Sequence, residues 1–129
     1  MTRRPRVYFG EWDEPMISGI GWVSELVGVA GGIDVFAALA AQPSAKDRVV
    51  SSDAVITAAP DIIIGSWCGK KFVPARVASR PGFADLPAVR RGWLREIKSP
   101  LILQPGPAAL TDGLDALTKI IAEWSAAPP

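Results

Sequence analysis

The stretch 59-APDIIIGSWCGKKF-72 decides how the rest of the chain is interpreted. Its three consecutive β-branched residues, 62–64, are typical of a short strand buried on both faces, as in parallel sheets. Gly65 ends this apolar run, and a loop with an indole, a thiol and two ammonium groups follows at once. Because ligands of open α/β sheets bind beyond the carboxyl ends of the strands, this loop is a candidate binding site. The alternative is that Trp67 packs on a neighbouring helix while Lys70 and Lys71 are solvated.

Strands and helices are predicted to alternate on either side of this stretch. Strands are predicted at 6–9, 47–50 and 93–97, and helices at 20–30, 34–41 and 74–79. Ser51 or Ser52 is predicted to cap a further helix that ends at Ala58. Residues 11–19 are predicted to form a loop, and residues 99–107 to be extended because three prolines disfavour a helix there. This alternation predicts a three-layer α/β fold, with a mostly parallel sheet covered by helices on both faces.

The closing segment is predicted to be an amphipathic helix that starts at Pro107. Its apolar face is expected to consist of Leu110, Leu114, Leu117, Ile121 and Trp124. Trp93 and Trp124 are therefore expected to belong to the core. The chain has five tryptophans in 129 residues, and the other three lie in or beside predicted loops.

Length and composition predict one soluble α/β domain over residues 5–127. The chain of 129 residues is 49% hydrophobic and 21% charged, which suits one globular core. The net charge of +1 gives no reason to expect nucleic acid as a partner. No apolar h-region follows Met1–Arg4, so no signal peptide is expected, and the chain expressed as written is expected to be cytoplasmic.

The absence of histidine from the sequence removes most catalytic and metal-binding arrangements. Without a histidine, no Ser-His-Asp triad or Cys-His dyad can form. One cysteine and no histidine also make a zinc site unexpected. We therefore expect no enzyme activity, no metal site and no covalently bound cofactor; a small α/β enzyme that uses Cys68 is an alternative.

Three segments together resemble a family of ligand receptors. They are 6-RVYFGEWDEPMISGIGWVSELVGVAGG-32, 59-APDIIIGSWCGKKF-72 and 80-RPGFADLPAVRRGWLREIKSPLILQPGPAALTDGLDAL-117. In this order they resemble the periplasmic-binding-protein-like family that serves ABC importers of cobalamin and iron–siderophores. The resemblance covers nearly the whole chain and is strongest to the cobalamin-binding branch. It implies a periplasmic location, an ABC permease as partner, and cobalamin, another corrinoid or a ferric siderophore as transported ligand.

The resemblance also implies that the chain corresponds to half of such a receptor. Receptors of this family have two α/β lobes, each Rossmann-like, joined by a long helix, with the ligand between the lobes. The chain resembles the carboxyl-terminal lobe, and the amino-terminal lobe and connecting helix are absent from it. Since half a cleft supplies about half of the contacts, ligand affinity of the lobe alone is expected to be poor.

Ligand contacts in this family come from loops at the strand ends, and eight residues of this chain occupy such positions. They are Trp12, Met16, Gly19, Trp22, Ser66, Trp67, Cys68 and Gln104. Indole faces cover a large, flat ligand at low entropic cost, which agrees with this set. Three alternatives remain: a homodimer or interaction module that covers the exposed half-cleft, the small enzyme mentioned above, and a fragment without a function of its own.

Overall fold

A mostly parallel sheet forms the centre of the structure. The computed structural model describes residues 4–13, 15–67, 70–103 and 107–127. The strands of this part are β1 (Arg6–Trp12), β2 (Met16–Ser18), β3 (Ile33–Asp34), β4 (Val49–Val50), β5 (Ile62–Gly65) and β6 (Leu94–Glu96). They are ordered β4-β2-β1-β5-β6, and β3 also pairs with β1. β1 runs parallel to β3 and β5, and β5 runs parallel to β6, whereas β2 is antiparallel to β1 and β4.

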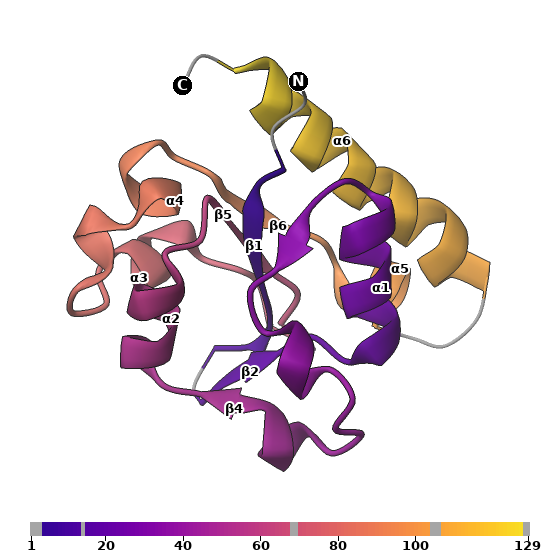
Figure 1. The fold of residues 1–129 in the computed structure, drawn as a ribbon, viewed down its shortest axis with the longest axis horizontal. Coiled ribbons are helices and arrows are strands. Elements are labelled where there is room, and N and C mark those ends of the chain that lie inside the picture. Colours follow the sequence, from indigo (N-terminus) through magenta and orange to yellow (C-terminus); the bar gives the residue numbers. More distant parts are fainter. Residues whose placement is uncertain (1–3, 14, 68–69, 104–106, 128–129) are drawn as a thin grey trace.

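Helices cover both faces of this sheet, as Figure 1 shows. On one face lie α1 (Gly21–Val29), α5 (Ser99–Ile102) and α6 (Leu114–Ala126), the last preceded by a π-helical turn at Ala109–Gly113. On the other face lie α2 (Ser52–Ala58), α3 (Pro74–Ala78) and α4 (Pro87–Arg90). Short 3₁₀ segments occur at Ala37–Leu39, Ala45–Arg48 and Phe83–Asp85. The three-layer α/β fold predicted from the sequence is confirmed.

The β-branched run in β5 is buried on both faces, as its composition predicts. Ile62 and Ile64 pack into the core on the α1/α6 face, and Ile63 packs into the core on the α2/α3 face. β1 beside it alternates in the same way, with Val7 on the first face and Tyr8 on the second. Because successive side chains of a strand point to opposite faces, a central parallel strand must be apolar at every position.

Most local predictions agree with the structure, but two loops, one helix and one side chain do not. The helix predicted at 34–41 is wrong: Asp34 ends β3 and its carboxylate accepts a hydrogen bond of 3.0 Å from the Phe36 amide, so a turn and the 3₁₀ segment Ala37–Leu39 follow. β1 continues to Trp12 and pairs with β2, so residues 11–19 are a hairpin with an irregular register rather than a loop. The segment from Ser99 begins with helix α5, because Pro100 lies in the first turn, where the missing N–H costs nothing. Leu110 is 66% exposed and does not join the apolar face predicted for the closing helix. Trp124 is buried as predicted, and Trp93 is half-buried against the same core.

The N-cap of α2 allows a direct test of the structure. The Ser51 Oγ accepts a hydrogen bond of 3.1 Å from the Ala54 amide. Ser51→Ala is expected to lower the free energy of unfolding by about 1 kcal/mol, measured by urea denaturation. Ser44→Ala is the matched control, since Ser44 precedes a 3₁₀ segment without a side-chain cap. Equal effects of the two substitutions would contradict the assigned cap.

Candidate functional site

The carboxyl ends of β1, β5 and β6 lie at the same edge of the sheet. β1 pairs with β5 up to Gly10 and Gly65, and β5 pairs with β6 up to Gly65 and Glu96. The β1–β2 turn, the segment from Ser66 to Val73 and the β6–α5 junction therefore emerge side by side. We call this region the carboxyl edge; α1 also begins here, because it follows the hairpin and runs back along the sheet (Figure 1).

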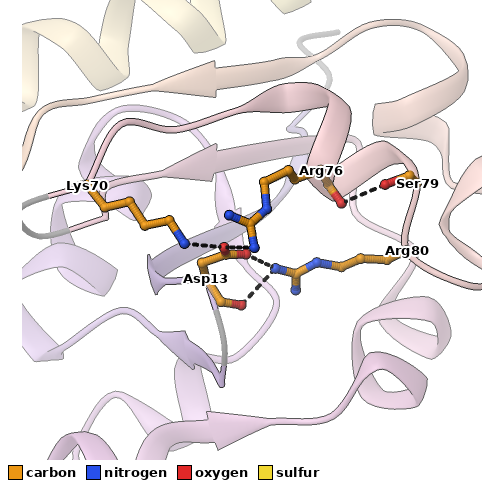
Figure 2. Close-up of polar contacts among 5 residues, drawn as sticks. All are labelled: Asp13, Lys70, Arg76, Ser79 and Arg80. Carbon is orange, nitrogen blue, oxygen red and sulfur yellow. Dashed lines mark hydrogen bonds and ion pairs between the residues drawn. The ribbon is translucent and has the colours of Figure 1, made fainter.

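A buried carboxylate, Asp13, organises the carboxyl edge. Its side chain is 2% exposed and pairs with the Lys70 Nζ at 2.7 Å and the Arg76 Nη2 at 2.9 Å. Arg80 donates from Nη2 to the Asp13 Oδ1 and, at 2.7 Å, to its backbone carbonyl. Figure 2 shows the three cationic side chains converging on this carboxylate. Lys70 follows β5, Arg76 lies in α3, and Arg80 comes just after α3. The pairs thus tie the β1–β2 turn to two other segments.

The cations around Asp13 keep its carboxyl ionised. Burial by itself would raise the pKa of Asp13. The hydrogen bond from Lys70 and the positive charges of Arg76, Lys70 and Arg80 outweigh burial, and the pKa lies below the usual value of 3.8. The carboxylate is therefore charged at neutral pH, and the region around it carries a surplus of positive charge.

A second buried ion pair fixes the start of α1. The Arg48 guanidinium is 3% exposed and lies 3.0 Å from the Glu11 carboxylate. The same carboxylate oxygen accepts a 2.7 Å hydrogen bond from the Ile20 amide, and Arg48 also donates to the Ser18 carbonyl at 2.5 Å. Arg48 also donates to the carbonyl of the exposed Gln42 at 3.0 Å, so this pair holds the hairpin, the Gln42–Arg48 segment and the helix start together.

Three of the eight predicted ligand residues gather around one small cavity. Trp12, Met16 and Trp67 line it together with core residues of the α2/α3 face. The cavity has a volume of about 10 Å³, which leaves room for about one water molecule. Met16 is 7% exposed and Trp67 is 5% exposed, with its ring packed edge-on against Phe72. Trp12 is half-buried and offers more accessible surface than the other two.

The other predicted ligand residues are dispersed. Gly19 is buried beside α1, and Trp22 in its first turn donates from Nε1 to the Ile102 carbonyl at 2.9 Å, which joins α1 to α5. Ser66 is fully buried, and among the described residues its hydroxyl has no hydrogen-bond partner. Cys68 and Gln104 lie outside the described residues. Whether any of the eight residues touches a ligand stays a prediction.

An open hollow lies next to the Trp67 segment. It has a volume of about 340 Å³ and is lined by Trp67, Glu96 and three lysines, Lys70, Lys71 and Lys98. Its lining residues follow β5 (Trp67, Lys70 and Lys71) or lie at the β6–α5 junction (Glu96, Lys98, Ser99 and Pro100), so the hollow lies at the carboxyl ends of two parallel strands. This is the place where the sheet topology predicts a ligand.

The residues that organise this edge were mostly missed by the sequence analysis. The three partners of Asp13 lie between 57 and 67 residues away in the chain, and no local pattern connects them. The sequence predicts Lys70 to be solvated or to contact a ligand; in the structure its ammonium group pairs with Asp13. The part of the chain that the structure describes contains no cluster of acidic, cysteine or histidine side chains suited to a metal ion. It also contains no helix of the length and apolarity that a membrane span requires.

Residues 1–101 match the sequence model of a protein family described as periplasmic binding protein. The chain belongs to this family. Its members are substrate-binding proteins. A search among curated proteins found no match to this periplasmic binding protein chain.

Solved structures of periplasmic binding proteins share the fold of the chain. A possible iron-binding, periplasmic solute-binding protein from Staphylococcus epidermidis ATCC 12228 has a TM-score of 0.76 at 18% identity, over 94% of this chain and 46% of its own. The vitamin B12-binding protein BtuF of Vibrio cholerae has a TM-score of 0.72 at 19% identity. The match covers 98% of this chain and 47% of BtuF. The periplasmic haem-binding protein RhuT from Roseiflexus sp. RS-1 has a TM-score of 0.66 at 25% identity. The match covers 94% of this chain and 48% of RhuT. The chain thus spans about half the length of each of these proteins.

Proposed function

We propose that the chain binds cobalamin, another corrinoid or an iron–siderophore at its carboxyl edge and presents it to an ABC permease without chemical change. The observation that carries the proposal is the position of the 340 Å³ hollow and of the half-buried Trp12 beyond the carboxyl ends of parallel strands. The vitamin B12-binding and possible iron-binding proteins that share its fold support this choice of ligands. A corrin or a siderophore complex is large, and an indole face suits such a surface.

We also propose that residues 5–127 act as a single lobe and that a second lobe completes the binding cleft. The solved structures are about twice as long as this chain, which supports this arrangement. The hollow is open, and the cavity beside it admits about one water molecule, so this lobe by itself cannot enclose a corrin. The little-exposed pairs Asp13–Arg80 and Glu11–Arg48 join separate segments of the edge, which supports a preformed surface for a second lobe.

The proposal is tested by titrating the intrinsic tryptophan fluorescence with cyanocobalamin and with ferrichrome, a ferric siderophore, with sedimentation velocity on the same sample. Saturable quenching by one of the two is expected. Trp12→Ala should weaken that affinity by about tenfold, as expected for an aromatic anchor. Trp93→Ala is the matched control, because Trp93 is also half-buried but precedes β6 at the opposite edge of the sheet. Trp67→Ala is less informative, since the ring is a core residue.

Three results would contradict the proposal. If neither probe saturates in a monomeric sample, this lobe does not bind these ligands by itself. If neither saturates and the protein sediments as a stable dimer, the carboxyl edge is better explained as an interaction surface. Equal loss of affinity in the Trp12 and Trp93 variants would place the ligand elsewhere.

A further inference from the structure

The hollow beside Trp67 combines lysines from two separate segments of the chain. Lys70 and Lys71 follow β5, whereas Lys98 follows β6, and the parallel pairing of these strands brings them to one edge. Glu96 is the acidic side chain among the lining residues of the hollow. The lining therefore carries three positive charges and one negative charge, although the whole chain has a net charge of only +1.

Two of the lysines have no charged partner among the described residues. Lys71 and Lys98 are exposed, and neither forms an ion pair or a hydrogen bond with its side chain in the part of the chain that the structure describes. Glu96 forms no ion pair with them in the described residues; its Oε2 accepts a hydrogen bond of 3.0 Å from the Phe72 amide, and its single negative charge leaves the lining with an excess of positive charge. An ammonium group that lines a hollow without a partner favours an anion there.

The third lysine is held in place. The Lys70 ammonium lies 2.7 Å from the Asp13 carboxylate and 5.6 Å from the centre of the Trp67 ring. Asp13 in turn is shared with Arg76 and Arg80, so that one carboxylate faces three cations. The surplus charge of this cluster adds to the positive potential of the hollow, and Lys70 belongs to both. Figure 2 shows how the side chain of Lys70 extends to this cluster.

We infer that the hollow lined by Lys70, Lys71 and Lys98 is an anion site that receives a carboxylate group of the ligand. That this carboxylate belongs to a transported ligand rests on the proposed function. The inference goes further in naming a ligand class, because cobalamin itself has no free carboxylate. A metal chelate that carries carboxylates would place its flat part against the half-buried Trp12 side of the edge and its acid groups between the two lysine-bearing segments.

The test is a titration with trisodium citrate, followed by amide NMR shifts of the ¹⁵N-labelled chain at low ionic strength. Saturable shifts at the amides of Lys71, Phe72 and Lys98 are expected, with a dissociation constant on the order of 1 mM. Added sodium chloride should weaken them, since exposed charges are screened. The double variant Lys71→Gln/Lys98→Gln should weaken citrate binding by about tenfold. The charge-matched control Lys46→Gln/Lys119→Gln alters exposed lysines outside the hollow and should bind citrate like the parent chain.

The outcomes distinguish this inference from the proposed function. Absence of saturable shifts, or equal weakening in the two double variants, would overturn the anion site even if cyanocobalamin or ferrichrome binds. Shifts that saturate with citrate but also with its neutral triethyl ester would overturn it as well. Citrate binding that depends on Lys71 and Lys98 would support the site, and it would do so even if neither neutral chelate binds.

Discussion

Replacing Asp13 with asparagine is expected to lower the free energy of unfolding by about 3 kcal/mol, the largest effect of any substitution considered for this chain. The carboxylate is 2% exposed, and Arg80 beside it is 15% exposed. Asparagine keeps the size of the side chain but leaves the Arg80 guanidinium without its counter-ion in a buried place. Lys70 and Arg76 are 37% and 52% exposed and regain water, so they add little to this loss.

The same carboxylate makes stability depend on pH in the acid range. Because the pKa of Asp13 is lowered in the folded state, its contribution is fully present above the usual value of 3.8. It is lost as the pH falls below that value and through the lowered pKa, since the folded state then binds the proton as well. Urea denaturation should therefore show that the free energy of unfolding of the parent chain decreases on acidification. The decrease should be smaller in the Asp13→Asn variant.

Asp47→Asn is the control for this prediction, since Asp47 is exposed and forms no ion pair in the described residues. It should leave both the stability at neutral pH and its acid dependence unchanged. If Asp13→Asn unfolds at the same urea concentration as Asp47→Asn, the Asp13 cluster does not hold the edge together.

Gly65→Ala is expected to destabilise the protein by about 2 kcal/mol, because its new methyl group has no space. A Cβ atom at this position would lie 2.0 Å from the Phe72 Cδ1. The Phe72 ring cannot move aside easily, since it is 4% exposed and packed against Trp67 at 4.9 Å between ring centres. The clash would displace the segment that lines the hollow, so citrate-induced shifts should weaken together with stability.

Two further variants make this prediction specific. Phe72→Leu combined with Gly65→Ala should recover part of the lost stability, because the smaller side chain makes room for the methyl group. Gly28→Ala is the control, since a Cβ there, in the last turn of α1, meets nothing within 4 Å. It should stabilise the protein by up to about 1 kcal/mol, as expected for alanine in a helix. Destabilisation by both alanine substitutions would contradict the packing described around Gly65.

The sequence by itself determined the fold class, because the decisive signals are local. The apolar run of β5 and the stripe of Val23, Leu26 and Val27 in α1 depend on side-chain spacing within about ten residues. The Ser51 cap and the proline at the start of α3 are equally local signals. The family resemblance agrees with these patterns, and the match over residues 1–101 confirms it.

Only the tertiary structure decided which side chains form the carboxyl edge. Asp13 meets Lys70 and Arg80 across 57 and 67 residues of sequence, and Lys98 lines the same hollow as Lys71 because β5 and β6 are parallel neighbours. Trp67 packs edge-on against Phe72 and also lines the hollow, and its contact with a ligand stays a prediction. The physical reason is that periodicity reflects contacts between near neighbours in the chain, whereas charge pairing and packing depend on strand order, which no local pattern encodes.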